Sequence, residues 1–198
     1  MAEESVLIIS PYVVPLEELR EHFRRRTADG VDITIYTNSL AATDHTYAFS
    51  GYAKYRPELL EMGINLREVK PNGAISSIHQ VSTSPADHIA LHGKLSVFDR
   101  RWVYVGSFNL DARSAFWNTE LGILVDSPEF AEQVLEDFTA DLDDDSSWRV
   151  ELRQEDGKKK GTLVWRSGDE ELASEPSRGK SQKVSNWFYS LFKLDEQL

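Results

Sequence analysis

An apolar run near the start of the chain constrains the fold class most strongly. Residues 5–14 read SVLIISPYVV, a β-branched pattern typical of a strand that is buried on both faces, as in a sheet covered by helices. Alternating runs at 32–37 and 64–70 predict two further strands, and a helical stretch precedes each of them, at 15–30 and 43–63. This order predicts an α/β fold with a mixed, largely parallel sheet flanked by helices on both faces.

The composition fits one ordinary domain followed by a tail. The chain has 198 residues, of which 40% are apolar and 11% aromatic, enough to fill one core. No run approaches the roughly 18 consecutive apolar residues of a transmembrane helix. The acidic start, MAEES, lacks the basic flank and apolar core of a signal peptide. We therefore expect neither a transmembrane helix nor a signal peptide.

Charge and cysteine content exclude several classes of function. The chain contains no cysteine, which excludes disulfides, thiolate catalysis and cysteine-bound zinc. Its net charge of −11 opposes non-specific attraction to nucleic acids and to anionic membranes, although a local basic face could overrule the sum. Nucleic acid is therefore not a favoured partner.

The stretch at 91–110, LHGKLSVFDRRWVYVGSFNL, brings several chemically capable side chains into strand register. Alternation at 91–98 predicts a strand, in which residues two apart point to the same side. His92 and Lys94 would therefore share a face, with an imidazole beside a fixed cation.

A second apolar run ends at Gly106 and brings further hydrogen-bond donors to the same region. Ser107 and Asn109 can curl back there with hydroxyl, amide and backbone N–H groups, which suit a phosphoryl oxygen. Asp99 has the opposite parity to His92, so we expect it to hold the turn at 100–101 as a structural residue rather than to reach a phosphate.

A polar loop, NSLAATDHT at 38–46, would leave the carboxyl end of the strand at 32–37, where open α/β sheets usually bind ligands. Asp44 and His45 are its candidate binding residues. Thr43 or Asp44 could instead cap the helix that follows, and the two roles are compatible.

A long loop at 71–88 adds His79 and His88 beside the proposed site. Loops of this length in compact domains are often functional or mobile. No nearby carboxylate pair has the spacing of metal ligands, so we interpret both histidines as surface residues and predict no metal site.

Four elements are expected after the motif: a strand at 119–125, a helix at 128–142, an acidic exit at 141–145, and a hairpin formed by 148–153 and 161–166. The buried stripe of the helix is predicted to contain Phe130, Val134, Leu135 and Phe138. The acidic exit lacks the glycine and terminal glutamate of a calcium-binding loop, so it is interpreted as a solvated linker.

A linker at 167–180 precedes a helical stretch at 181–193 that has lysines on either side of an apolar stripe. The stripe comprises Val184, Trp187, Phe188, Leu191 and Phe192. Such a stripe fits a helix that lies on a membrane surface or on a neighbouring protein, and docking onto the domain itself is the alternative.

The spacing within the stretch at 91–110 resembles the HKD motif of the phospholipase D superfamily. Four residues separate His92-x-Lys94 from Asp99, and six separate Asp99 from Gly106-Ser107-x-Asn109. Six constrained positions at fixed spacing make this a specific resemblance.

Neighbouring segments extend the resemblance to the cardiolipin synthase branch of that superfamily. The run GSFNLDARSAFWNTELG resembles the corresponding stretch of bacterial cardiolipin synthases, in which an acidic residue at the position of Glu120 orients the catalytic histidine. SPYVVP, TNSLAATDH and GYAKYRPELLEMGINLREVK are similar to the C-terminal half of the two-motif enzymes, as is the tail ending in LDEQL. The expected parts are a phospholipase D-like domain at 1–145, a hairpin extension at 146–167, and a linker with amphipathic tail at 168–198.

The resemblance implies phosphoryl-transfer chemistry without a metal or cofactor. One imidazole attacks phosphorus to form a phosphohistidine while the opposite one protonates the leaving alcohol, and the lysines and asparagines of both motifs neutralise the transition-state charge. His92 is either the nucleophile or the general acid/base. Lys94, Asn109 and Glu120 are the other expected catalytic residues. Ser107 and Asp44 are expected to bind substrate.

The chain has one such motif where the resemblance implies two. The missing histidine could come from a second half of the same parent protein or from another copy in a homodimer. A start immediately before an apolar strand favours a truncated half. The implied function is phosphatidyl transfer between phospholipids by a protein peripheral to the cytoplasmic side of the membrane. The alternatives are a homodimeric single-motif phosphodiesterase or nuclease and a membrane-binding module.

Overall fold

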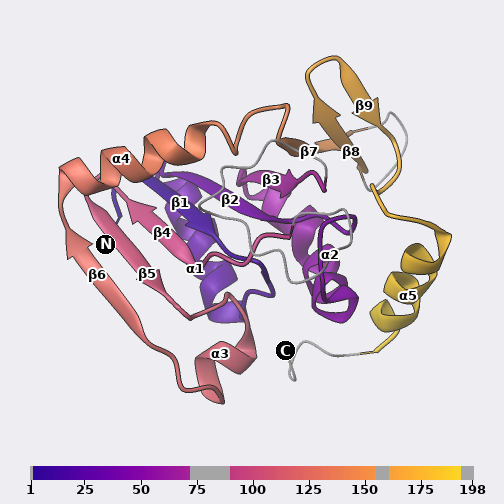
Figure 1. Cartoon of the computed structure of the whole chain (residues 1–198), viewed down its shortest axis with the longest axis horizontal. Helices are drawn as coiled ribbons and strands as arrows, with labels where there is room; N and C mark the ends of the chain where they lie inside the picture. Colours follow the sequence, from indigo (N-terminus) through magenta and orange to yellow (C-terminus); the bar gives the residue numbers. More distant parts are fainter. Residues whose placement is uncertain (1, 72–89, 155–160, 193–198) are drawn as a thin grey trace.

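The computed structural model describes residues 2–71, 90–154 and 161–192. In these residues one sheet of nine strands runs through the molecule in the order β6-β5-β4-β1-β2-β3-β7-β8-β9 (Figure 1). The strands are β1 (Ser5–Ile9), β2 (Asp32–Asn38), β3 (Asn65–Val69), β4 (Leu95–Phe98), β5 (Trp102–Gly106), β6 (Gly122–Asp126), β7 (Ser147–Arg153), β8 (Thr162–Ser167) and β9 (Glu170–Leu172). The helices are α1 (Glu17–Ala28), α2 (Thr46–Glu61), α3 (Ala112–Phe116), α4 (Pro128–Thr139) and α5 (Lys180–Ser190).

The sheet is less parallel than the sequence predicts. β1 pairs in parallel with β2, and β2 with β3, whereas the other six neighbouring pairs are antiparallel. Parallel neighbours need a crossover connection, and α1 and α2 supply it for the first three strands, while short turns join β4 to β5 and β8 to β9. The α/β class is confirmed, and the largely parallel sheet is wrong.

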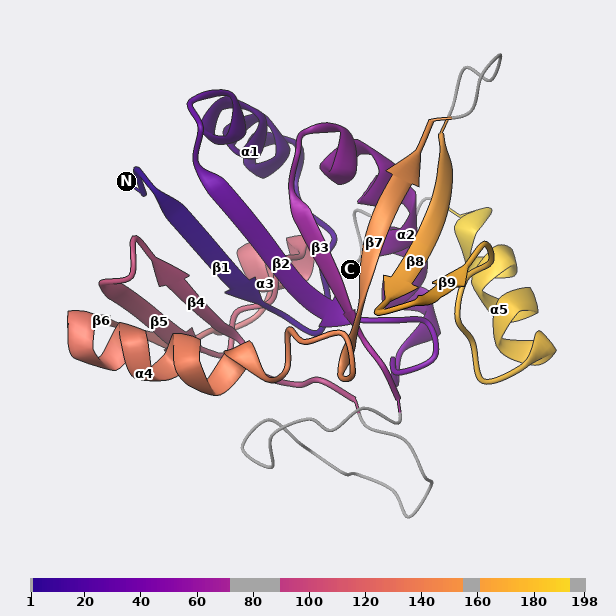
Figure 2. The same cartoon turned by 90° about the horizontal axis from the view of Figure 1, so that it is seen from above.

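Helices cover both faces of the sheet, as predicted. α1 and α2 lie on one face and α4 on the other (Figure 2). Val6 and Ile8 of β1 pack into the same cluster as Phe23 of α1. Leu7 and Ile9 belong instead to the cluster formed with α4. Because alternate residues of β1 are buried on opposite faces, the run is apolar without interruption.

The stripe on α4 is largely as predicted. Val134 and Phe138 are buried, and Leu135 packs partly against the same cluster. The prediction that Phe130 is buried is wrong, since 37% of its surface is exposed. Ala131, the next residue, is fully buried and is the one in the first turn that faces the sheet.

The strands that flank the motif begin later than the sequence predicts. β4 begins at Leu95, the partner of Ile9 at the end of β1. Since β1 ends at Ile9 and β4 begins at Leu95, His92 and Lys94 lie just before the strand. β6 likewise begins at Gly122 instead of residue 119.

The expected capping of α2 by Thr43 or Asp44 is wrong. The N-cap residue is His45, and no side-chain hydrogen bond caps the helix. The Thr43 hydroxyl accepts a hydrogen bond from the His45 backbone N–H at 3.2 Å, and the Asp44 carboxylate accepts one from the Tyr12 hydroxyl at 3.0 Å. Asp44 is therefore turned toward the β1 side of the loop.

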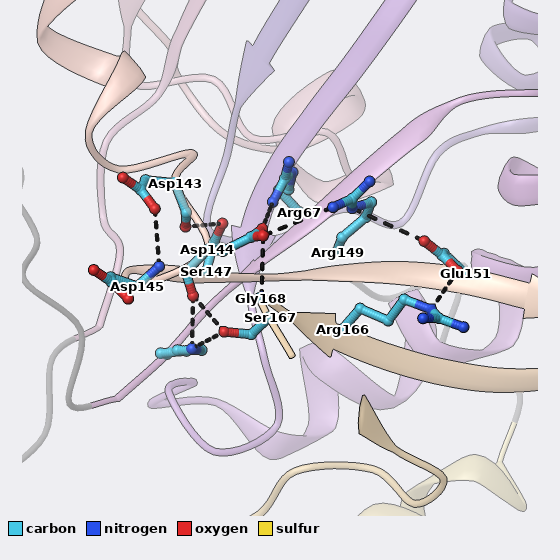
Figure 3. Close-up of polar contacts among 11 residues, drawn as sticks. Arg67, Asp143, Asp144, Asp145, Ser147, Arg149, Glu151, Arg166, Ser167 and Gly168 are labelled. Atoms are coloured by element: carbon cyan, nitrogen blue, oxygen red, sulfur yellow. Dashed lines mark hydrogen bonds and ion pairs between the residues drawn. The ribbon is translucent and has the colours of Figure 1, made fainter. Parts of the chain in front are cut away.

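The acidic exit of α4 is not a solvated linker. Asp141 is fully buried. The two Asp144 oxygens are held by Arg67 of β3 at 2.9 Å and by the backbone N–H of Gly168 at 3.0 Å, with Arg149 of β7 at 3.8 Å (Figure 3). This stretch joins α4 to β3 and to the turn between β8 and β9, because Arg67 and the Gly168 backbone N–H both bind Asp144.

The C-terminal hairpin extends the main sheet. β7 and β8 form the predicted antiparallel pair, and β7 continues the sheet by pairing with β3. The segment expected to be a linker contains a short strand, β9, paired with β8. The predicted amphipathic helix is present as α5. The division of the chain into three parts stays a prediction, and residues 72–88, with His79 and His88, lie outside the described residues.

A buried ionic network ties α2 to the sheet. Glu68 of β3 is fully buried and accepts hydrogen bonds from Tyr52 at 3.0 Å, Arg56 at 2.8 Å and Trp165 at 2.8 Å. Arg56, whose side chain is 3% exposed, also donates to Glu175 at 2.8 Å. Burial by itself disfavours the charged guanidinium, but these carboxylates raise the Arg56 pKa above its usual value.

Candidate active site

Strand register brings the motif residues to one edge of the sheet. Ile9 of β1, Leu95 of β4, Val105 of β5 and Ile123 of β6 are successive partners across the sheet. One residue beyond this row, the backbone N–H of Gly106 donates to the Lys94 carbonyl at 3.1 Å. The segments that carry the motif's histidine, serine and glutamate therefore all leave the sheet beside the carboxyl end of β1.

Asn38, the last residue of β2, fixes the backbone immediately before the histidine. Its buried side chain donates to the Leu91 carbonyl at 3.0 Å and accepts from the Leu91 N–H at 2.8 Å. His92 therefore lies where the carboxyl end of β2, a strand with parallel neighbours, meets the segment that leads into the antiparallel strand β4. The sequence interpretation missed this residue, and the only signal for it was a carboxamide that ends a buried strand.

His92 is exposed and has a cation beside its backbone. The Lys94 ammonium donates to the His92 carbonyl at 2.9 Å. Partial burial and the Lys94 charge lower the pKa of His92 below its usual value, with a smaller contribution in the same direction from His45, while Asp44 acts in the opposite direction. Near neutral pH the imidazole is therefore mainly uncharged, which is the form that can attack phosphorus or accept a proton.

Ser107 and Glu120 form a second group of contacts across β5 and β6. The Ser107 hydroxyl donates to one Glu120 oxygen and accepts from the Leu121 N–H at 3.0 Å. Asn118 donates to the other Glu120 oxygen at 3.0 Å. The Ser107 bond, helped by Asn118, lowers the pKa of Glu120. No hydrogen bond joins Glu120 to His92 among the described residues, so its expected orienting role stays a prediction.

Asn109 lies where the loop enters α3. Its backbone N–H donates to the Ser114 hydroxyl at 3.2 Å, and Asp111 caps the helix by accepting from the Ser114 N–H at 2.7 Å. Its own Oδ1 atom is buried and has no hydrogen-bond partner within the described part of the chain. The carboxamide is therefore held by its backbone and keeps unused hydrogen-bonding capacity.

Tyr12, Asp44 and His45 border the same site. Tyr12 donates to Asp44 at 3.0 Å, the second Asp44 oxygen lies 3.7 Å from Nε2 of His45, and the Tyr12 and His45 rings are 5.6 Å apart between centroids. Burial, together with Asp44, raises the pKa of Tyr12, which keeps its proton as a donor. The sequence interpretation selected Asp44 and His45 but gave Tyr12 no role.

Asp99 and Gly106 both have backbone roles, but the Asp99 carboxylate holds residues 3–5 rather than the turn at 100–101 that the sequence predicts it to hold. Asp99 sits at the opposite end of β4 and accepts hydrogen bonds from the N–H groups of Glu3, Glu4 and Ser5 at 2.8–3.0 Å. Burial opposes its ionisation, but these bonds lower its pKa. Gly106 leaves no room for a side chain, since a Cβ atom there would lie 2.6 Å from the Leu121 carbonyl oxygen.

The charge of the site is dominated by carboxylates. Burial lowers the pKa of Lys94, while Asp44, Glu120 and Asp111 act to raise it. Within the described residues the site thus has one lysine facing three carboxylates. No cluster of three or more metal-ligating side chains occurs in the described part of the chain.

The sheet and its helices define a phospholipase D-like fold. The structure is similar to Nuc, a phospholipase D family member from Salmonella typhimurium, with a TM-score of 0.52 and 20% identity over 73% of this chain and 81% of that chain. It is also similar to phosphatidylserine synthase from Haemophilus influenzae, with a TM-score of 0.60 and 15% identity over 100% of this chain and 41% of that chain.

The family follows from the sequence comparison. The family described as "Cardiolipin synthase, PLD-like domain" matches residues 1–142, and the chain belongs to it. The chain is 37% identical to cardiolipin synthase C of Escherichia coli over 150 residues, which is 75% of this chain and 32% of that protein. It is also 37% identical to an uncharacterized Helicobacter pylori protein over 133 residues, or 67% and 26% of the two chains. The chain thus spans about a quarter to a third of these relatives.

Proposed function

We propose that the chain is one half of a phosphatidyltransferase that makes cardiolipin-type lipids. His92 acts as nucleophile or general acid/base, and Glu120 orients its imidazole. Lys94 and Asn109 bind the phosphoryl oxygens. Ser107 and Asp44 are the further substrate-binding residues. Family membership and similarity to a cardiolipin synthase support the phospholipid substrate. The membrane surface is the expected location of that substrate.

The balance of charge at the site carries the proposal that a second half is needed. A phosphodiester brings one negative charge, and its transition state concentrates more charge on the phosphoryl oxygens. Among the described residues Lys94 is the lysine of the site, and the negative charges of Asp44, Glu120 and Asp111 already act on it, so the charge of the phosphoryl group is left uncompensated. A second half that contributes a lysine and a histidine would supply both the missing cation and the second proton-transfer group.

The reaction then proceeds in two displacements. The neutral histidine of one half attacks phosphorus, the bond from phosphorus to the leaving alcohol breaks, and the histidine of the other half gives that alcohol its proton. The second histidine next removes a proton from the acceptor lipid's hydroxyl, whose oxygen attacks the phosphohistidine and releases the first imidazole. The lowered pKa of His92 suits either the attacking or the proton-accepting role.

An uncovered apolar surface beside the site supports docking of that second half. β6 is an edge strand with apolar residues exposed on both faces, Ile123 at 64% and Leu124 at 58%. Leu124, Trp102 and Phe108 line an apolar cavity of about 530 Å³ on the face that α1 only partly covers. Phe108 lies between Ser107 and Asn109, so a partner seated here would reach the site.

Reconstitution tests the proposal. The chain is mixed with a separately produced half that carries the second motif of the parent protein, and phosphatidylglycerol vesicles are analysed for cardiolipin and glycerol. We expect both products in the mixture and neither from either half alone. His92→Ala should abolish the products, whereas Glu132→Ala, which changes an exposed side chain of α4, should not. A mixture that stays inactive while both halves form a complex would contradict the proposal.

A homodimeric phosphodiesterase is the second candidate, and similarity to Nuc favours it only through the fold. In a homodimer two copies of His92 would face each other. The chain alone would then cleave a small soluble phosphodiester and sediment as a dimer. A monomeric mass with no cleavage by the isolated chain would rule this candidate out.

The third candidate, a module that only binds membranes, would keep vesicle binding in the His92→Ala variant and have no transferase activity in any mixture.

A further inference from the structure

The C-terminal helix α5 attaches to the rest of the chain through its polar face. Gln182 is buried and donates to the Leu40 carbonyl, and its own oxygen accepts from the Arg178 N–H at 2.9 Å. Arg178 in turn donates to the Thr43 carbonyl at 2.9 Å. Asn186, one turn after Gln182, is the other residue of α5 that is not exposed. The helix therefore has a fixed orientation beside α2, as both views show (Figures 1 and 2).

The apolar face of α5 is largely exposed, although Trp187 also lines a groove against α2. Val184, Trp187, Phe188, Leu191 and Phe192 are each between 51% and 63% exposed. A helix that packs onto its own domain normally buries its apolar stripe and exposes its polar face. α5 does the reverse, so docking onto the domain does not account for its stripe.

The charge around the stripe indicates which partner it fits. Residues 176–192 contain three basic and no acidic residues, in a chain of net charge −11. Lys180 and Lys183 are exposed, and within the described residues no carboxylate lies within ion-pair distance of either. Aromatic residues bordered by lysines are typical of helices that lie in the surface of an anionic bilayer. No helix among the described residues is long and apolar enough to span a membrane.

We propose that α5 lies in the surface of an anionic phospholipid bilayer, with its apolar stripe among the acyl chains and Lys180 and Lys183 on the lipid phosphates. Leu40 and Thr43, the residues that hold α5, belong to the loop that carries Asp44 to the site. The bilayer would thus be fixed relative to His92. The inference deepens the proposed function, and rests on it for the view that this contact presents lipid substrate.

Vesicle binding by the full chain tests the inference. Phosphatidylcholine vesicles are compared with vesicles made of equal parts phosphatidylcholine and phosphatidylglycerol, by co-sedimentation. We expect binding to the anionic vesicles that weakens as salt is raised. Trp187→Ser should weaken it by roughly tenfold or more, because a large apolar side chain no longer leaves water. Replacing Lys180 and Lys183 by glutamine should cost roughly fivefold per lysine, and only on anionic vesicles.

The matched control replaces an apolar residue of equal exposure elsewhere. Ile123→Ser, on β6, removes a side chain that is 64% exposed, against 63% for Trp187, and should bind vesicles as the unaltered chain does. Unaltered binding by Trp187→Ser, or no binding by the unaltered chain, would overturn the inference. So would a fall in sedimented mass caused by Trp187→Ser without lipid, because that would identify a protein partner for the stripe.

A separate measurement distinguishes this inference from the proposed function. The reconstituted mixture is assayed on a water-soluble phosphodiester, whose cleavage needs the site but no bilayer. Vesicle binding without cleavage would contradict the proposed function alone. Cleavage without vesicle binding would contradict the role of α5 alone.

Discussion

At the scale of single residues, the chemistry of the site depends on the charges near one imidazole. His92 is exposed, so it is not burial alone that determines its protonation. Lys94 lowers its pKa and Asp44 raises it, and the two residues reach it from different parts of the chain. Because the unfolded chain binds a proton at His92 more readily, this residue makes the free energy of unfolding rise with pH between its lowered pKa and the ordinary value of 6.5.

The opposing effects of these two charges can be measured directly. Lys94→Gln should raise the pKa of His92, because a nearby positive charge is lost, and Asp44→Asn should lower it further, because a negative charge is lost. The measurement is an NMR titration of the imidazole, with His92→Ala to assign its signal. Arg100→Gln, at the far end of β4, removes a charge without affecting the titration. Movement of both site variants in the same direction would contradict this account.

At the scale of elements, α2 is held to the sheet by a buried ion pair as well as by apolar packing. Glu68 accepts three hydrogen bonds from α2 and β8 and thereby joins a helix, a central strand and the C-terminal hairpin. α2 begins just after the loop that contains Asp44, and its middle is fixed through this network by Tyr52 and Arg56. The position of that loop therefore depends on a residue far from the chemistry.

Removing Glu68 should be costly. We expect Glu68→Ala to lower the free energy of unfolding by about 3–5 kcal/mol, because Arg56 is left buried with an incomplete set of partners. Urea denaturation measures the change. Glu132→Ala breaks an ion pair with Arg100 in which both side chains are exposed, and it should cost less than about 1 kcal/mol. Similar losses for the two variants would show that burial of the pair is unimportant.

At the scale of the whole molecule, two apolar surfaces remain uncovered and they point to different partners. The β5 and β6 surface adjoins the site and fits a second half, whereas the stripe of α5 is bordered by lysines and fits a bilayer. One surface lies at the β6 end of the sheet and the other beside α2 (Figure 1). Both could therefore be occupied at once.

The separation of these surfaces gives a reciprocal prediction. Leu124→Asp places a charge on the β6 surface and should weaken binding of the second half by roughly tenfold or more, as measured by sedimentation equilibrium of the mixture. Vesicle binding by this variant should be unchanged. Val184→Asp, on the equally exposed stripe of α5, should do the opposite. Loss of both kinds of binding in either variant would argue for a single shared surface.

The sequence by itself determined the α/β class, most of the helices and strands, the C-terminal hairpin and the family. These properties depend on local periodicity and on a motif whose spacing is fixed along the chain. The buried run at 5–14 is an example, since alternate residues of β1 pack on opposite faces.

Only the tertiary structure decided how the strands pair and what surrounds the histidine. Antiparallel pairing of β4 with β1 depends on contacts between residues about ninety positions apart, for which sequence periodicity has no signal. The acidic exit of α4 looked solvated because its partners, Arg67 and Gly168, lie far from it in the chain. Tyr12 and Asn38 were likewise missed as site residues, because their hydrogen-bond partners lie far from them in the chain. The orientation of α5 also needed the fold, because periodicity defines an apolar face but not the direction in which it points.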